Sequence, residues 1–205
     1  MRKTCASSLI VLDFETTGLS PNMGDRAIEI GAVRLEEGVV VDRFQALMNP
    51  GKPVSAFIEH YTGITNRMLS KAAPCDEVMD KFAHFIGDRN LVAHNASFDK
   101  RFLDAELGRI FKSYNGHFAC SLLVARRLYQ QAPNHKLGSL IDYKNIPSEG
   151  GFHRALYDSE MTAKLWMAML EDISQIISAE VVPFTLIQKI AKTPKNAVKK
   201  LLQAQ

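Results

Sequence analysis

Two carboxylates at the end of an apolar stretch constrain the fold more than any other feature of the sequence. Residues 9–14 are apolar on both alternating faces except at Asp13, the pattern of a central strand buried on both sides. Asp13 and Glu15 are two residues apart, so a strand would point both side chains to one face. Burying two like charges together is costly unless a cation lies between them. The stretch predicts either a metal site at the end of a core strand, or a strand that ends early and leaves both acids in a solvated loop.

Length and composition indicate one globular domain with a small appendage. The chain has 205 residues, of which 46% are hydrophobic and 23% charged. Its first apolar run, residues 9–12, is too short for a secretory signal, and no stretch is long enough to span a membrane. Cys5, Cys75 and Cys120 show no paired spacing, which argues against a disulfide framework or a zinc site. We therefore expect a cytoplasmic protein without membrane association.

The order of apolar patterns predicts an α/β fold. Residues 27–35 and 39–47 alternate as strands and are joined by a hairpin signal at 36–38, so that with the first strand they form an antiparallel meander. Helices and short strands then alternate up to a long helix over residues 154–177. This order predicts a mixed sheet flanked by helices. Parallel strands of such sheets bind ligands beyond their C-terminal ends, where the two acids lie.

Charge is concentrated in the last 26 residues. Residues 180–205 hold five lysines and one glutamate, a net charge of +4, whereas the whole chain carries +3. Two short amphipathic helices are expected at 184–191 and 195–202. The lysines could be a solvated face, while the segment as a whole could cover the body, dock on a partner or contact nucleic-acid phosphates.

Three further residues are candidates for a polar site. Asp158 shares a helical stripe with the apolar Leu165 and Met169, so it points inward and needs a partner, for which a shared metal is one answer. Asp99 lies where a short strand passes into a helix, and alone it would more simply be an acid of the helix's first turn. His153 precedes the long helix as a cap or surface residue or, beside a metal-bound water, as a general base.

Three motifs in order resemble those of the DEDDh exonuclease superfamily, most closely its DnaQ-like 3′–5′ exonucleases, which include proofreading subunits and domains of bacterial replicases. They are DFETTG from Asp13, HNASFD from His94 and HRALYD from His153, with a connecting IEHYTGIT from Ile58. The likeness covers roughly residues 7–175. It implies a ribonuclease H-like α/β fold, with a mixed five-stranded sheet of an antiparallel meander followed by parallel strands. We expect an exonuclease domain over residues 1–179 and a basic helical extension over 180–205.

The resemblance also implies roles for individual residues. The ligands of two divalent cations, Mg²⁺ or Mn²⁺, would be Asp13, Glu15, Asp99 and Asp158, with His153 as the base. Four carboxylates balance the charge of two such ions, and oxygen ligands suit them. Further residues are expected to hold the terminal nucleotides, with local packing or capping as the alternative. These are Thr16, Thr17, Gly18, Leu19, Thr62, His94, Asn95 and Phe98.

The activity implied is removal of nucleoside 5′-monophosphates from single-stranded or frayed DNA 3′ ends, in proofreading or repair. An RNA 3′ exonuclease and a non-catalytic nucleic-acid-binding subunit of the same fold are the alternatives. By analogy with proofreading subunits, the extension could bind a DNA polymerase or another replisome protein. Two departures from the family pattern could alter the pocket: Tyr157 precedes the last aspartate, and Cys120-Ser121 stands where many members have Asp-Thr.

Overall fold

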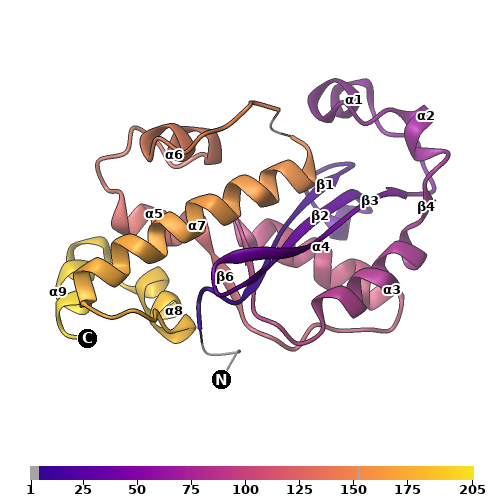
Figure 1. The fold of residues 1–205 in the computed structure, drawn as a ribbon. Coiled ribbons are helices and arrows are strands. Elements are labelled where there is room, and N and C mark those ends of the chain that lie inside the picture. The colour runs from indigo at the N-terminus through magenta and orange to yellow at the C-terminus, as the bar shows by residue number, and fades with distance from the viewer. Residues whose placement is uncertain (1–4, 152) are drawn as a thin grey trace.

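The structure is a computed structural model that describes residues 5–151 and 153–205. Its centre is a mixed sheet with the strand order β4-β3-β2-β1-β5-β6 (Figure 1). The strands are β1 (Leu9–Thr16), β2 (Ala27–Glu36), β3 (Val39–Asn49), β4 (Ala73–Pro74), β5 (Leu91–Ala93) and β6 (Phe118–Cys120). The first three form the predicted antiparallel meander, and β5 and β6 add parallel strands beside β1. The α/β prediction is confirmed. The sheet exceeds the five expected strands by the two-residue β4, which pairs with the end of β3.

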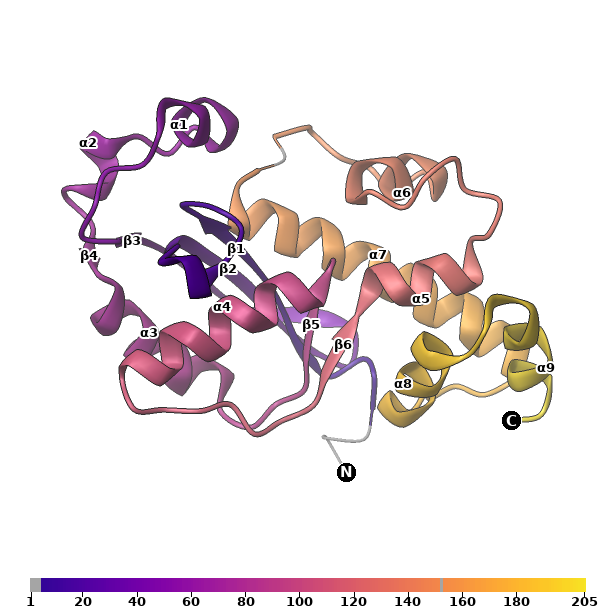
Figure 2. The ribbon, with the colours of Figure 1, turned by 180° about the vertical axis from the view of Figure 1, so that it is seen from behind.

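Helices cover both faces of this sheet. On one face lies α7, and on the other lie α3 and α4 (Figures 1 and 2). The helices are α1 (Ala56–Thr62), α2 (Asn66–Leu69), α3 (Cys75–Ile86), α4 (Ala96–Arg109), α5 (Ser121–Leu128), α6 (Leu137–Tyr143), α7 (Ala155–Ile177), α8 (Phe184–Lys192) and α9 (Val198–Gln203). None of them, within the described residues, is long and apolar enough to cross a membrane.

The place of β1 between two layers of helices explains why residues 9–12 are all apolar. Leu9 and Val11 pack in the core on the α7 side, whereas Ile10 and Leu12 pack in the core on the side of α3 and α4. All four side chains are fully buried. A strand between two helical layers must be apolar on both faces, so every polar residue within it marks an exception.

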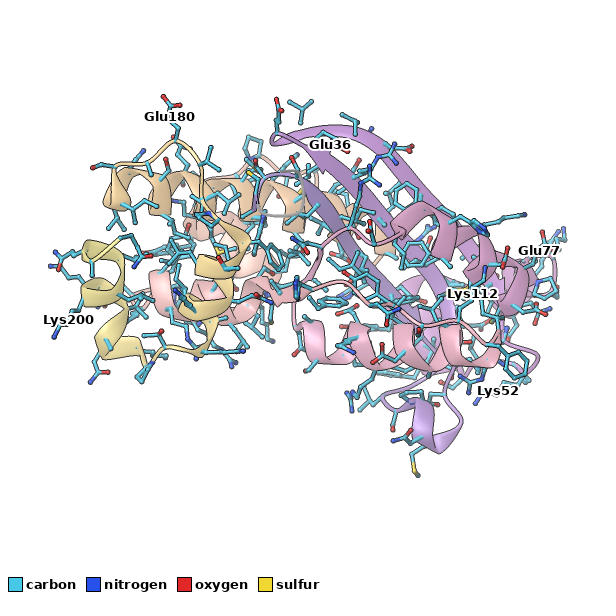
Figure 3. All side chains as sticks on the ribbon, turned by 90° about the horizontal axis from the view of Figure 1, so that it is seen from below. Glu36, Lys52, Glu77, Lys112, Glu180 and Lys200 are labelled. Carbon is cyan, nitrogen blue, oxygen red and sulfur yellow. The ribbon has the colours of Figure 1, made fainter. Side chains whose placement is uncertain are left out.

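The C-terminal extension packs onto the body. Its helices α8 and α9 bury Phe184, Ile187 and Leu202 in the same core cluster as Trp166 of α7. All five of its lysines are exposed, and Lys200 points outward from α9 (Figure 3). The two predicted helices are confirmed, although the second begins with a 3₁₀ turn, Lys195–Ala197. The apolar side of the extension therefore covers the body, and its basic side faces solvent.

Candidate active site

The two acids of β1 lie inside the strand and not in a loop. Asp13 is paired with Gly31 and Glu15 with Glu29 of β2 in the antiparallel register, and the strand continues to Thr16. Residues directly opposite in such a pair share a face, so both acids point to the α7 side of the sheet. Glu15 is buried and Asp13 half-buried. The alternative of a strand that ends early is therefore wrong.

Asp99 and Asp158 come to the same place from two different helices. Asp99 lies in the first turn of α4, is buried, and accepts a hydrogen bond from the backbone N–H of Phe14 at 3.2 Å. Asp158 lies in the first turn of α7 and is also buried. Its Oδ2 accepts the backbone N–H groups of His153 at 2.7 Å and Arg154 at 3.2 Å. Asp99 thus lies in the first turn of a helix and also faces the strand β1, which carries Asp13 and Glu15.

The electrostatics of the four carboxylates reflect burial and mutual repulsion. Burial raises the pKa of Asp13 well above its usual range, and the charges of Asp99, Glu15 and Asp158 raise it further. Burial and the charge of Asp158 raise the pKa of Glu15 to about 8. Burial also raises the pKa of Asp99 to about 7 and that of Asp158. Such shifts arise where like charges are held together away from water, and a cation bound among them would oppose the shifts.

These residues fit a divalent metal. Glu15, His153 and Asp158 each offer one ligand atom, and these atoms lie within 4.8 Å of one another. Asp13 and Asp99 belong to the same group, since the charges of Asp99, Glu15 and Asp158 all raise the pKa of Asp13, and the charge of Asp99 also raises that of Glu15. Carboxylate oxygens are the donors that Mg²⁺ and Mn²⁺ prefer. All five residues predicted for the catalytic centre are therefore brought together.

An aromatic row that sequence reasoning missed leads to His153. The ring of Tyr61 lies 4.0 Å from that of His153, centroid to centroid, and 5.8 Å from the ring of Phe57, on which it stacks. Tyr61 is 49% exposed and Phe57 is 71% exposed. Burial and the charges of Glu15 and Asp158 raise the pKa of Tyr61. The sequence signal for this row was the spacing of its two exposed aromatic residues on α1, which are four positions apart and so lie on one side of a helix.

The turn after β1 is stabilised by its own contacts. Thr16 Oγ1 donates to the carbonyl of Gly18 at 2.6 Å, and Thr17 Oγ1 donates to Asp25 Oδ1 at 3.2 Å. A Cβ on Gly18 would lie 2.5 Å from the Asp25 carboxylate, so the glycine makes room for that side chain. Leu19 is 78% exposed. These contacts account for Thr16, Thr17 and Gly18 without a substrate, whereas Leu19 is left at the surface.

Two other residues expected to bind substrate are held by local contacts. The Nε2 of His94 lies 2.9 Å from the carbonyl of His135, and its Nδ1 lies 2.9 Å from Ser121 Oγ. Burial lowers the pKa of His94 to about 4, so the ring is neutral near pH 7 and offers no charge to a phosphate. Thr62 is buried, donates to the carbonyl of Ile58 and accepts the N–H of Ile64.

The remaining residues expected to bind substrate lie at the surface or partly within the core. Asn95 is exposed and adopts the left-handed conformation, with φ of 73°, as the N-cap of α4. Phe98 is half-buried, with its ring 5.0 Å from that of Phe102. Of the two departures from the family pattern, Tyr157 on α7 packs against the core, and Ser121 contacts His94. Neither departure displaces an acid of the cluster.

Comparison with known proteins finds related sequences and supports the fold. The Exonuclease family model matches residues 10–166. A "DNA polymerase III PolC-type" protein of Bacillus cereus is 39% identical over 173 residues, which are 84% of this chain and 12% of that protein. The protein of the same name from Bacillus subtilis is 40% identical over 168 residues, or 81% of this chain and 12% of that protein. The chain thus matches about 12% of the length of these curated relatives.

Solved structures of similar fold also include exonucleases. Exonuclease X in complex with 5′ overhanging duplex DNA is 28% identical, with a TM-score of 0.67 over 80% of this chain and 92% of that one. The nuclease domain of 3′hExo, a DEDDh family member bound to rAMP, is 21% identical, with a TM-score of 0.71 over 86% of this chain and 96% of that one. The second match shows the fold, and it confirms the ribonuclease H-like architecture.

Proposed function

The chain belongs to the exonuclease family, as a DnaQ-like DEDDh 3′–5′ exonuclease, and from this premise we propose that it hydrolyses the terminal phosphodiester bond of single-stranded or frayed DNA 3′ ends. The observation that carries the proposal is the group of four carboxylates, of which Glu15, Asp99 and Asp158 are buried, with His153 beside it. The relatives named as DNA polymerases favour DNA over RNA and a role in proofreading or repair. The product would be a nucleoside 5′-monophosphate.

In this proposal the acids hold two divalent cations, Mg²⁺ or Mn²⁺. When bound, such a pair lowers the pKa of an attacking water and stabilises the charge on the departing 3′ oxygen. Asp13 would be a ligand of this pair together with Asp99, Glu15 and Asp158, whose charges raise its pKa. His153 accepts the proton of the attacking water, since an imidazole can take up a proton near neutral pH and its ring nitrogen lies beside the carboxylates of Glu15 and Asp158.

Apolar side chains at the rim would hold the terminal nucleotides. Leu19 is exposed at the turn after β1 and Phe98 is half-buried on α4, so both can contact bases without reading their sequence. Tyr61 and Phe57 offer a stacking surface for a further base beside the proposed catalytic histidine. Asn95 and the backbone of Thr16, Thr17 and Gly18 supply polar contacts to the 3′ end.

A nuclease assay tests this proposal. Labelled DNA and RNA oligomers with free or blocked 3′ ends are incubated with the protein in Mg²⁺ or in chelator. We expect 5′-mononucleotides from free 3′ ends, faster from DNA, only with metal. Asp158→Asn should abolish the release, whereas Asp172→Asn, on the same helix but bonded to Tyr129 and Lys144, should not. Faster release from RNA would favour the RNA exonuclease, and no release from either polymer would leave the nucleic-acid-binding subunit.

The partner proposed is a DNA polymerase, because the chain matches a small part of two PolC-type polymerases. The extension would meet it through its basic surface, since its apolar side is already buried against the body. We place the protein in the cytoplasm, where its free thiols, Cys5, Cys75 and Cys120, would stay reduced. Co-purification with a replicase, and its loss on reversing the charge of the extension, would test the partner.

A further inference from the structure

Glu29 of β2 is a fully buried carboxylate that the proposed mechanism does not use. Its Oε1 accepts from Arg154 at 2.9 Å and from Gln45 Nε2 at 2.9 Å. Its Oε2 accepts from Arg154 Nε at 3.2 Å and from the backbone N–H of Ala155 at 3.1 Å. A charge in such surroundings persists only when it is paired and hydrogen-bonded, and here both oxygens are satisfied.

These bonds fix the beginning of α7. Arg154 is the N-cap of that helix and Ala155 its first residue, so Glu29 holds the point where the helix starts. The backbones approach closely at the same place: a Cβ on Gly31 would overlap the backbone N of Leu156. Ser159 Oγ donates to the carbonyl of Gly31 at 2.9 Å. The first turns of α7 are therefore attached to β2 at two positions on one face.

The same positions of β2 face the acids of β1. Glu29 is opposite Glu15, and Gly31 is opposite Asp13. Asp158 lies one turn into α7, and His153 lies just before its N-cap. The strand β1 thus carries Asp13 and Glu15. Its neighbour β2 is bonded to the start of α7, which brings Asp158 and the preceding His153 to the same place. The contacts of Glu29 set the distance between Glu15 and the pair of Asp158 and His153.

A second buried glutamate makes similar contacts and serves as an internal comparison for Glu29. Glu106 of α4 is also buried, and it binds Arg26 through bonds of 2.8 and 2.9 Å and the backbone N–H of Ala27 at 3.2 Å. It holds the start of β2 and not that of α7. Its charge acts on Arg26 and Cys75, whereas the charge of Glu29 raises the pKa of Asp13, Glu15 and Asp158.

We propose that Glu29 is a positioning residue of the active site, which through Arg154 and the N–H of Ala155 places Asp158 and His153 against Glu15 for proton transfer, and whose charge supports metal binding. Glu29 itself contacts neither metal nor substrate. Its charge also balances that of Arg154, which would otherwise stand unpaired near Glu15 and repel a cation. The catalytic part of this inference rests on the proposed exonuclease function, whereas the metal-binding part does not.

The test compares Glu29→Gln with Glu106→Gln in the full chain. Mn²⁺ binding is measured from the electron paramagnetic resonance signal of free Mn²⁺, and kcat and KM are measured at saturating metal. We expect Glu29→Gln to weaken Mn²⁺ binding about tenfold, because one uncompensated positive charge then lies near the site. We expect its kcat to fall about 100-fold with little change in KM, as a displaced catalytic group would cause. Glu106→Gln should lower Tm but leave Mn²⁺ affinity and kcat near wild type.

Rescue separates charge from position. The double variant Glu29→Gln with Arg154→Gln restores neutrality, so Mn²⁺ affinity should return while kcat stays low. Should Glu29→Gln fail to fold, Arg154→Lys serves instead, because the Arg154 side chain is 41% exposed and a lysine keeps the charge but loses the fork of two bonds. Its kcat should fall about tenfold at unchanged Mn²⁺ affinity.

Equal effects of Glu29→Gln and Glu106→Gln on Mn²⁺ affinity would overturn the proposal, as would a wild-type kcat in Arg154→Lys. Failure of the proposed function would look different: the wild-type protein would release no nucleotide. The Mn²⁺ comparison between the two glutamine variants would then still decide whether the charge of Glu29 supports metal binding at the acidic cluster.

Discussion

The backbone N–H of His153 donates to Oδ2 of Asp158 at 2.7 Å, so the proposed base and a proposed metal ligand are joined through the main chain. His153 has a φ of 74°, a conformation that non-glycine residues adopt rarely. The bond therefore ties the position of Asp158 to the backbone of residue 153 and not to its imidazole. A change of the His153 side chain can remove the base while leaving the carboxylate in place.

His153→Ala should abolish turnover and preserve metal binding. Loss of a general base costs roughly 10²–10⁴ in rate, while the backbone bond to Asp158 remains. Single-turnover release of mononucleotide and Mn²⁺ titration measure the two effects separately. His84→Ala is the matched control, since that histidine is exposed on α3 and bonds to its own helix. Near-normal rates for His153→Ala around neutral pH would show that the base is another group.

Without metal, stability should fall as the pH rises from about 4.5 to about 8, because the pKa of Glu15 is raised to about 8 in the folded chain. Between these values the folded state binds more protons than the unfolded state, so the free energy of unfolding decreases with pH, by up to about 1.4 kcal/mol per pH unit for each extra proton. Urea unfolding in chelator at several pH values measures the slope. Glu15→Gln should flatten it, and saturating Mg²⁺ should raise stability at the alkaline end. A rise in stability with pH in chelator would contradict the burial of this acid.

Gly31→Ala should destabilise the fold by about 1–3 kcal/mol, because the new methyl group overlaps the backbone of α7 and forces the helix away from β2. Denaturant unfolding measures the loss. Gly108→Ala is the control: a Cβ there meets nothing within 4 Å, and in the last turn of α4 alanine should stabilise by up to about 0.5–1 kcal/mol. Stabilisation of the chain by both substitutions would contradict the close approach of α7 to β2 at Gly31.

Tyr61→Ala should weaken binding of single-stranded DNA by about 1–3 kcal/mol, the range for loss of one base stack. The effect should appear in KM and in the binding constant of a catalytically inactive Asp158→Asn background. Phe111→Ala provides the control, since that ring is 99% exposed but belongs to no aromatic pair with His153. Equal affinities of the two variants would exclude a stacking role for the row on α1.

Reversing the charge of Lys199 and Lys200 tests the basic surface of the extension. If these exposed lysines contact phosphates, the slope of log K against log salt should fall by about 0.7 for each lost contact with a single strand. Cutting the chain after residue 179 is a poor test, because it would remove Phe184, Ile187 and Leu202 from the core and destabilise the body. A salt slope identical to that of the wild type would show that the lysines are only a solvated face.

The sequence predicted the parts of the site that violate a local pattern. Asp13 interrupts an apolar strand and Asp158 interrupts an apolar helical stripe, so both were visible as costly exceptions. Glu29 was not visible, because a glutamate in an alternating strand is ordinary until its partner is known. That partner, Arg154, is 125 residues away, and no periodicity connects the two.

The predicted substrate residues show a second limit of sequence reasoning. Gly18 was expected to hold the terminal nucleotides, and the contact that a Cβ there would disturb is with Asp25. His94 was expected to do the same, and both of its ring nitrogens have partners within the chain. Such assignments depend on which neighbour fills the space next to a side chain. That information comes from the packing of segments distant in sequence, and a motif does not contain it.

The bond between Glu29 and Arg154 also has a consequence for the newly made chain. The hairpin of β1 and β2 can form from local contacts, and it carries Asp13 and Glu15, but it holds no cleavage-competent site until α7 has docked 125 residues later. A partly folded or partly unfolded molecule would therefore keep half of its acids and cut nothing. Nuclease activity would therefore report on the docking of α7 onto the hairpin as well as on the presence of the acids.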